Sequence, residues 1–168
     1  MASGKVELIQ LHTTVNGESF QVGIEPRELL LDFLRDRLGL KGAKRSCDVQ
    51  VCGACTILLD GEPVSACCTL AYETQNRSVT TIEGLSKGNK LHPIQKAFLD
   101  EVAVQCGYCT SGMVLTVKSL LEQESKPTTS IIKAYLDGNL CRCTGYWNII
   151  KAVKRAAEDM EDDVMERT

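Results

Sequence analysis

Eight of the nine cysteines in this 168-residue chain form two groups of four. In the first group, Cys47-x4-Cys52-x2-Cys55 is followed by Cys67 after eleven intervening residues. The second group consists of two short pairs, which are Cys106, Cys109, Cys141 and Cys143. Four thiolates are the usual ligand set for an iron–sulfur cluster and also for structural zinc. The cysteines therefore predict two separate metal-binding centres on one small chain.

The first group favours iron–sulfur chemistry over zinc. Its spacing is typical of plant-type 2Fe-2S ferredoxins, whereas structural zinc sites favour two short Cys-x2–4-Cys knuckles. We expect Gly42 and Gly53 to let the loop bend tightly and bring backbone amides close to the sulfides. Three basic residues should place positive charge near the anionic centre, namely Lys41, Lys44 and Arg45.

The second group requires a different local structure. Residues at i and i+2 lie about 200° apart around a helix, so Cys141 and Cys143 must sit on a turn before the last helix. Cys106 and Cys109 likewise precede a predicted helix that begins at Ser111. Helix N-termini favour anionic groups, but zinc and a second 2Fe-2S cluster both stay open on spacing alone. Three neighbours could keep this site dry, namely Tyr108, Leu140 and Tyr146.

Residues 1–83 predict a β-grasp-like domain of the ferredoxin type, with a mixed sheet and one packed helix. Asn16-Gly17 and Asp60-Gly61 suit tight hairpin turns, because both positions of a type I′ turn require positive φ. Pro26 should open the helix and Gly39 should end it. The expected elements are strands 6–15 and 19–25, helix 26–38, and strands 56–59, 62–65 and 79–82.

The composition changes after a polar linker at residues 84–89. The following domain, residues 90–160, reads as all-α, with Gly138 as a left-handed cap at the end of its third helix. Residues 161–168 form an acidic tail. The expected helices are 94–104, 111–124, 130–136 and 146–160, so the fold class is α+β with a helical second domain.

Composition excludes several functional classes. The net charge of -3 argues against nucleic-acid binding, and no apolar run approaches the roughly 20 residues of a membrane helix. The N-terminus lacks the apolar core of a signal peptide, so we expect a cytoplasmic protein whose cysteines bind metal. No dinucleotide loop, phosphate loop or nucleophile elbow is present, so substrate chemistry should occur on another chain.

Three sequence strings resemble the iron–sulfur subunit of the xanthine oxidase family of molybdenum hydroxylases. They are Cys47-Asp48 with Cys52-Gly53-Ala54-Cys55-Thr56, then Gln105-Cys106-Gly107-Tyr108-Cys109-Thr110-Ser111-Gly112-Met113, then Asn139-Leu140-Cys141-Arg142-Cys143-Thr144-Gly145-Tyr146. The likeness spans residues 6–156. It implies a plant-type ferredoxin domain followed by a four-helix bundle, and a 2Fe-2S cluster in each.

The resemblance also implies partners and an electron path. A large molybdenum–pterin subunit and a medium FAD subunit would complete the complex, often as a dimer of heterotrimers. Electrons would pass from molybdenum to the cluster of the second group, then to the cluster of the first group, and then to FAD. Gln105 and Cys143 would lie against the pterin, although a helix-capping role for the Gln105 amide is the plainer alternative.

Three residues depart from the family pattern without touching a ligand. Ser111 stands where proline is common, Trp147 where a small or polar residue is common, and Cys68 where an aliphatic residue is common. We expect a buried apolar role for Cys68 and a core or interface position for Trp147.

The favoured hypothesis is a bacterial electron-transfer subunit whose complex hydroxylates an N-heteroaromatic compound such as quinoline. Carbon monoxide, aldehyde, nicotine or purine dehydrogenases are alternative complexes, because the large subunit decides the substrate. A stand-alone two-cluster carrier and a zinc-stabilised interaction module are the rival functions.

Overall fold

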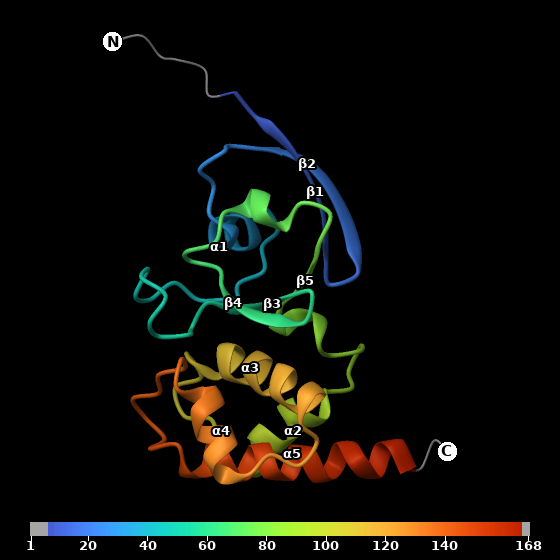
Figure 1. Ribbon diagram of the computed structural model, residues 1–168, viewed down its shortest axis with the longest axis vertical. Helices are drawn as coiled ribbons and strands as arrows, with labels where there is room; N and C mark the ends of the chain where they lie inside the picture. The colour runs from blue at the N-terminus through green and yellow to red at the C-terminus, as the bar shows by residue number, and fades with distance from the viewer. Residues whose placement is uncertain (1–6, 166–168) are drawn as a thin grey trace.

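A small sheet domain stacks on a helical domain in this computed structural model, which describes residues 7–165 (Figure 1). The five-stranded sheet has the order β2-β1-β5-β3-β4. Its strands are β1 (Ile9–Val15), β2 (Glu18–Ile24), β3 (Thr56–Leu59), β4 (Glu62–Ser65) and β5 (Ser78–Thr80). The predicted α+β order of a mixed sheet followed by helices is confirmed.

Both predicted hairpins are present. Asn16 and Gly17 have φ values of 52° and 85°, and Asp60 and Gly61 have values of 51° and 90°. These angles are those of type I′ turns, whose twist matches that of the flanking strands. β5 pairs in parallel with β1 and antiparallel with β3, but it stops at Thr80. The 3-10 turn η3 (Ile82–Gly84) follows, so the predicted strand 79–82 ran too far.

The helix of the sheet domain starts later than predicted. It runs as α1 (Leu30–Asp32) and continues as one π-helical turn, η1 (Phe33–Arg37). Leu29 is still extended and pairs with Leu70 in an isolated β-bridge, which delays the helix beyond Pro26. The helix buries four side chains beneath the sheet, namely Leu30, Leu31, Phe33 and Leu34. A further 3-10 turn is η2 (Ala71–Thr74).

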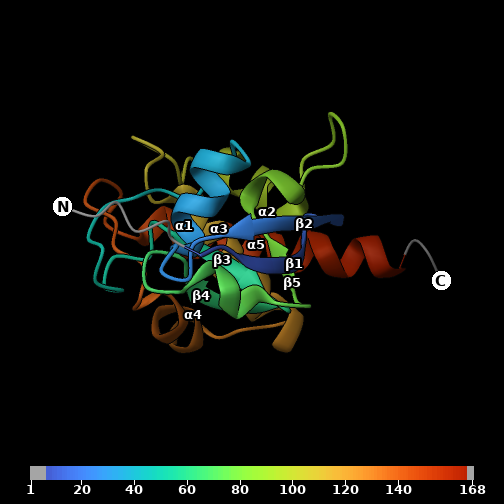
Figure 2. The same ribbon diagram turned by 90° about the horizontal axis from the view of Figure 1, so that it is seen from above.

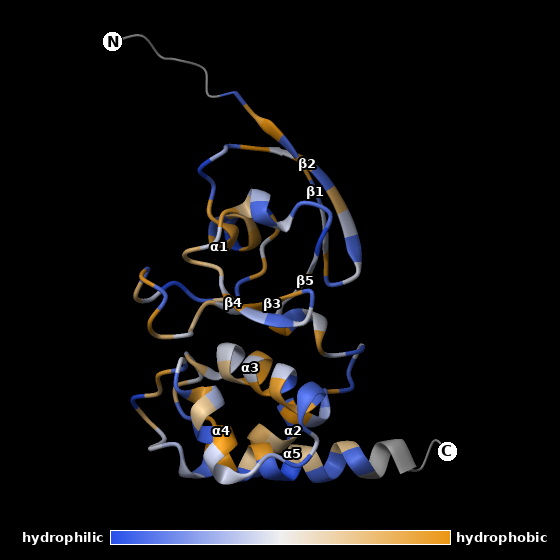
Figure 3. Cartoon of the chain, in the orientation of Figure 1, coloured by the Kyte–Doolittle hydropathy of each residue, from blue (hydrophilic) through white to orange (hydrophobic). Residues whose placement is uncertain are grey.

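The second domain contains four helices that share one hydrophobic core: α2 (Pro93–Asp100), α3 (Thr110–Gln123), α4 (Thr129–Leu136) and α5 (Trp147–Met165). α2 packs on α5, and α3 packs on α4. α5 carries hydrophobic and hydrophilic patches in turn along its length (Figure 3). Within residues 7–165, no helix has an apolar stretch long enough to cross a bilayer.

Several predicted ends in this domain were wrong. α2 stops at Asp100, where Val102 with φ of 50° turns the chain, rather than at residue 104. Gly138 does not have the left-handed backbone that was predicted for it. The C-cap of α4 is Asp137, which keeps a helical φ of -59°. α5 continues to Met165, so the first part of the predicted acidic tail is helical. Residues 1–6 and 166–168 lie outside the described residues.

Strand β3 joins the two domains, because both of its faces are buried. Ile57 and Leu59 point into the core of the sheet domain, while Leu58 belongs to the core of the helical domain. Leu85 from the predicted linker 84–89 is also buried in the helical core. In both views α3 lies against β3 (Figures 1 and 2).

The closest contact between the domains is made by backbone. A Cβ atom added to Gly112 of α3 would lie 2.0 Å from the Gly53 carbonyl oxygen. Gly53 itself has φ of +68°, and a Cβ there would lie 2.4 Å from the Gly138 oxygen. Ser111, at a position where the family commonly has proline, donates a hydrogen bond to the Gly42 oxygen at 2.6 Å. The junction therefore tolerates no side chain at either glycine.

A matched pair of glycine substitutions tests this junction. Gly112→Ala should lower the free energy of unfolding by about 2 kcal/mol, because over-packing strain exceeds the gain in helix propensity of about 1 kcal/mol. Gly138→Ala is the control, because no atom lies within 4 Å of its Cβ position and its φ is not positive. Chemical denaturation would measure both variants. Equal stability of the two would contradict the contact.

Candidate iron–sulfur sites

The first site brings together the four predicted cysteines from one loop and one strand end. Cys47, Cys52 and Cys55 lie on the loop before β3, and Cys67 follows β4. The thiols of Cys47 and Cys52 contact each other, as do those of Cys55 and Cys67. Cys55 and Cys67 are buried in the sheet-domain core, whereas Cys47 and Cys52 are half-buried. The site thus has a buried and a more exposed side.

The loop stabilises negative charge at Cys47. Backbone amides of Val49, Val51 and Cys52 donate to this thiol and lower the pKa of Cys47 to about 6. Asp48 and Gln50 make this possible, because their φ values of 55° and 56° curl successive amides inward. Such curled amides form an anion-binding nest.

The pKa of Cys55, on the buried side of the first site, shifts in the opposite direction to that of Cys47. Burial raises the pKa of the Cys55 thiol to about 12, against the lowering effect of the Cys67 amide. Desolvation disfavours the charged form of any thiol, so Cys55 ionises at neutral pH only with a positive charge beside it. Iron bound to the site would supply that charge.

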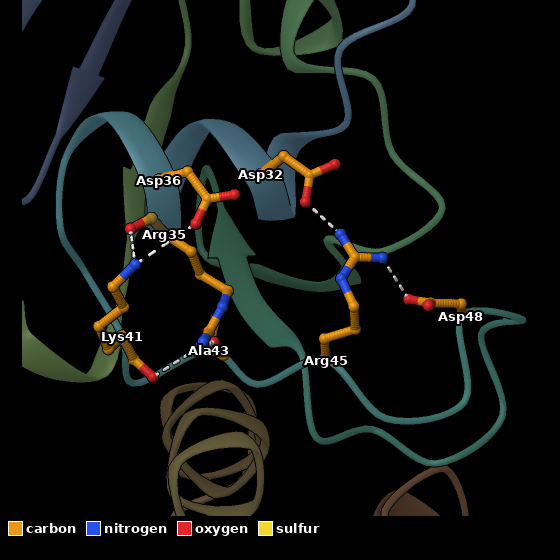
Figure 4. A network of polar contacts seen from close by, with 7 residues as sticks. All are labelled: Asp32, Arg35, Asp36, Lys41, Ala43, Arg45 and Asp48. Atoms are coloured by element: carbon orange, nitrogen blue, oxygen red, sulfur yellow. Dashed lines mark hydrogen bonds and ion pairs between the residues drawn. The ribbon is translucent and has the colours of Figure 1, made fainter.

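Ion pairs hold the same loop to the helix of the sheet domain (Figure 4). Arg45 bridges Asp32 and Asp48, and Lys41 pairs with Asp36. The Arg35 guanidinium also donates to the Ala43 oxygen at 2.6 Å. Lys41 and Arg45 are thus each paired with a carboxylate, and the expectation that they place positive charge near the cluster stays a prediction.

The two predicted glycine roles have different outcomes: Gly53 bends the loop with φ of +68°, as expected, whereas Gly42 does not bring its amide to a sulfide. The Gly42 amide donates to the Glu83 carboxylate at 2.7 Å, so it does not face a sulfide. Lys44 turns toward the domain junction, where its ammonium lies 3.0 Å from the Gly42 oxygen and 5.9 Å from the Tyr108 ring centre. Glycine at 42 and 53 serves the packing between segments.

The second site joins two turns that each precede a helix, as the spacing predicted. Cys109 is the N-cap of α3, and Cys141 and Cys143 lie on the turn before α5. The sulfurs of Cys143 and Cys106 are 3.5 Å apart, and the thiols of Cys109 and Cys141 are also in contact. A cavity of about 520 Å³ is lined by these four cysteines and also by Cys52 of the first site. One cysteine of the first site, Cys52, therefore reaches the cavity of the second site.

Hydrogen bonds again favour charge on selected sulfurs. The Thr144 hydroxyl donates to the Cys141 sulfur at 3.1 Å, and the amides of Cys143 and Thr144 donate at 3.4 Å. Although burial opposes ionisation of Cys141, these donors bring its pKa below the ordinary value. The Tyr108 amide and the Cys143 thiol lower the pKa of Cys106, whereas burial raises that of Cys109 to about 12.

The pairing of thiols fits a 2Fe-2S cluster at each site. The thiols lie in two pairs per site: Cys47 with Cys52, Cys55 with Cys67, Cys106 with Cys143, and Cys109 with Cys141. Two pairs of thiolates match the two irons of such a cluster. All nine cysteines are free thiols.

The residues expected beside the pterin lie on the surface. Gln105 and Cys143 are both exposed next to Cys106. Since Cys109 occupies the N-cap of α3, Gln105 does not cap that helix. Tyr108 and Leu140 are 46% and 53% exposed, so they do not keep the second site dry within this chain.

Of the unusual residues, Cys68 was misplaced by the sequence analysis, and of the two positions expected for Trp147 only the interface stays open. Cys68 is exposed rather than buried, because a tight turn from Ser65 places it on the surface with its sulfur 3.7 Å from that of Cys67. Trp147 is 67% exposed at the start of α5, with the Lys151 ammonium 5.8 Å from its ring centre. A core position for Trp147 is therefore wrong, while an interface position stays a prediction.

Comparison with known proteins identifies the two halves. The family described as 2Fe-2S iron-sulfur cluster binding domain matches residues 13–79, and the family described as 2Fe-2S binding domain matches residues 81–154. The chain is 44% identical to the nicotinate dehydrogenase small FeS subunit of Eubacterium barkeri, over 89% of this chain and 96% of that protein. The chain belongs to the iron–sulfur subunits of the xanthine oxidase family of molybdenum hydroxylases.

Other members of this iron–sulfur subunit family are equally similar. Subunit beta of the 6-hydroxypseudooxynicotine dehydrogenase complex of Paenarthrobacter nicotinovorans is 46% identical, over 85% of this chain and 90% of that protein. A chain of quinoline 2-oxidoreductase from Pseudomonas putida 86 superposes with a TM-score of 0.88 at 43% identity, covering 92% of this chain and 97% of that chain. The order of the two 2Fe-2S binding domains and the α+β class are therefore shown.

The sequence analysis missed two residues that shape these iron–sulfur sites. Thr144 follows the last cysteine, and its hydroxyl could have been noticed as a local donor to sulfur. Asn139 contacts Gly53, 86 positions earlier in the chain, so no local pattern could have indicated its partner.

Removing the Thr144 hydroxyl should change the second site electronically. A hydrogen bond to sulfur stabilises the reduced cluster, so Thr144→Val should make the reduction potential of the cluster expected on Cys141 more negative. Thr144→Ser keeps the donor and should titrate like the wild type. An EPR-monitored redox titration of the purified complex measures both clusters, with the first as internal reference. An unchanged midpoint in Thr144→Val would contradict this role.

Proposed function

We propose that this chain relays electrons within a molybdenum hydroxylase, through two 2Fe-2S clusters held by its eight paired cysteines. The ligands would be Cys47, Cys52, Cys55 and Cys67 at the first cluster, and Cys106, Cys109, Cys141 and Cys143 at the second. The observation that carries this proposal is the clustering of the thiols at each site, with the Cys52 side chain of the first site on the wall of the cavity that the second site lines. We also assign α2 to α5 to the four-helix bundle of this family.

The second site would receive electrons and the first would release them. When bound, the clusters supply one-electron transfer between a molybdenum–pterin centre and FAD on partner subunits. Gln105 and Cys143 would contact the pterin, because both are exposed at the mouth of the second site. The Leu140 amide donates to the Cys52 oxygen at 2.9 Å and so connects a ligand of the first site to the turn that carries the second.

Exposed apolar side chains beside each site support two different partner subunits. Val49 and Val51 are 65% and 56% exposed on the loop of the first site. Tyr108, Leu140 and Trp147 are exposed around the second. Exposed apolar groups beside buried ligands are typical of surfaces that a partner covers. A medium FAD subunit at the first site and a large molybdenum subunit at the second would exclude water from both, in a dimer of heterotrimers.

The substrate is proposed to be an N-heteroaromatic compound, such as quinoline. The similar proteins named above are subunits of nicotinate and quinoline enzymes, and a caffeine dehydrogenase subunit gamma of a Pseudomonas is 42% identical. An aldehyde is the second candidate, because the iron-sulfur-binding subunit PaoA of an Escherichia coli aldehyde oxidoreductase is 39% identical over 92% of this chain. Free thiols at all nine cysteines favour the reducing cytoplasm.

Elemental analysis of the native complex tests the relay. The chain would be purified from its own host, and iron, molybdenum, flavin and zinc would be measured in what co-purifies. Four irons per chain with molybdenum and flavin are expected. Four irons without molybdenum or flavin would indicate a stand-alone carrier, and zinc without iron would indicate an interaction module.

Breaking one ligand of the second site should uncouple the complex. Cys106→Ser removes a thiolate from the Cys106–Cys143 pair, so transfer to flavin should fall to background while molybdenum stays bound. Stopped-flow reduction of flavin by substrate, with molybdenum measured on the same sample, gives the result. Cys68→Ser is the control, since Cys68 is outside both ligand sets and should keep normal turnover. Normal flavin reduction in Cys106→Ser would contradict the assignment of Cys106 as a cluster ligand.

A further inference from the structure

Asn139 is a buried residue whose side chain bonds to two other segments at the domain junction. It is 4% exposed, on the turn between α4 and Cys141. Its amide nitrogen donates to the Gly53 oxygen at 3.2 Å, and its amide oxygen accepts from the Thr116 hydroxyl of α3 at 2.9 Å. Both ends of the amide are therefore satisfied by segments distant in sequence.

Those two hydrogen bonds lie beside the direct link between the cluster loops. The residue after Asn139 is Leu140, whose amide donates to the Cys52 oxygen. The residue after Cys52 is Gly53, which receives the Asn139 amide. Asn139 and Leu140 on one loop thus bond to Gly53 and Cys52 on the other. Cys52 belongs to the first site, and Leu140 directly precedes Cys141 of the second.

Neither segment can shift to make this contact in another way. Gly53 is left-handed, and a Cβ atom on it would lie 2.4 Å from the Gly138 oxygen. On the other side, the missing side chain of Gly112 leaves room for the Gly53 oxygen. The Asn139 carboxamide is the group between them that offers both a donor and an acceptor. A carboxylate of the same shape would accept from Thr116 but would face the Gly53 oxygen with a second oxygen.

We propose that Asn139 is a positioning residue, which fixes the distance and orientation between the two cluster sites. This inference rests on the proposed function, because it concerns how the two clusters couple. The side chain contacts neither set of sulfurs, so it acts through the Cys52–Gly53 and Leu140–Cys141 backbone. Loss of its donor would separate these backbones and weaken the interaction between the clusters without removing any ligand.

Asn139→Asp in the purified complex is the test, with Asn16→Asp as a matched control. Asn16 also uses both ends of its amide, donating to the Thr81 hydroxyl at 2.9 Å and accepting from the Thr81 amide at 2.8 Å. It also lies close to a glycine, Gly84 of η3, and both of these hydrogen bonds go to Thr81, outside either cysteine loop. The same chemical change therefore removes a comparable bridge that does not connect the two cysteine loops.

Two readouts separate positioning from general destabilisation. The first is the magnetic splitting between the two reduced clusters in EPR spectra, with iron measured per chain. The second is hydrogen exchange at the Leu140 amide, which reports on the junction itself. Asn139→Asp should keep four irons per chain, lose the splitting and exchange faster at Leu140. Asn16→Asp should match the wild type in both, and Thr116→Val, which frees only the amide oxygen, should fall between.

The outcomes also separate this inference from the proposed function. Wild-type splitting and unchanged Leu140 exchange in Asn139→Asp would overturn the positioning role, as would equal losses in Asn16→Asp. If Asn139→Asp loses iron, the milder Thr116→Val carries the same comparison. Absence of two clusters in the wild type would refute the electron relay instead, and the exchange rates would still decide whether Asn139 holds the two loops together.

Discussion

The carbonyl oxygen of Gly53 is the point on which both domains depend. It accepts the Thr56 hydroxyl at 2.8 Å, the Thr56 amide at 3.2 Å and the Asn139 amide at 3.2 Å. The absence of a side chain at Gly112 lets α3 approach this same oxygen. A buried carbonyl must be paired, and here its partners come from the end of the first loop and the start of the second. The position of one peptide group therefore sets the relation between the two cysteine sites.

The electrostatics of each site divide its sulfurs into two kinds. Amides and hydroxyls lower the pKa of Cys47 and Cys141, while burial raises that of Cys55 and Cys109 to about 12. The first kind attracts a cation before it binds, whereas the second becomes a thiolate only when metal compensates for the lost solvation. Each thiol pair at the second site joins one sulfur of lowered pKa to one of raised pKa, because the Cys106 thiol raises the pKa of Cys143 and burial raises that of Cys109.

Local patterns predicted what depends on neighbours in sequence. The cysteine spacing, the two hairpins with Asn16 and Asp60, and the placement of the second site at helix starts are all short-range features. The predictions that failed depend on distant partners. Leu29 is held extended by Leu70, Gly138 is not left-handed, and the Gly42 amide donates to Glu83. The predicted burial of Cys68 failed because side-chain type alone does not place a residue in the core of its own chain.

The exposed residues beside the second site bear on the solvation of its thiolates. Reduction potentials of iron–sulfur centres depend on solvent exposure and on hydrogen bonds to sulfur. Cys106 and Cys143 are exposed, and Tyr108 and Leu140 line the same cavity without covering them. A surface laid over these side chains would desolvate the outer thiolates while leaving the internal donors, such as Thr144, in place. The chain alone therefore fixes the geometry between its two sites, whereas the solvation of the second site depends on what covers it.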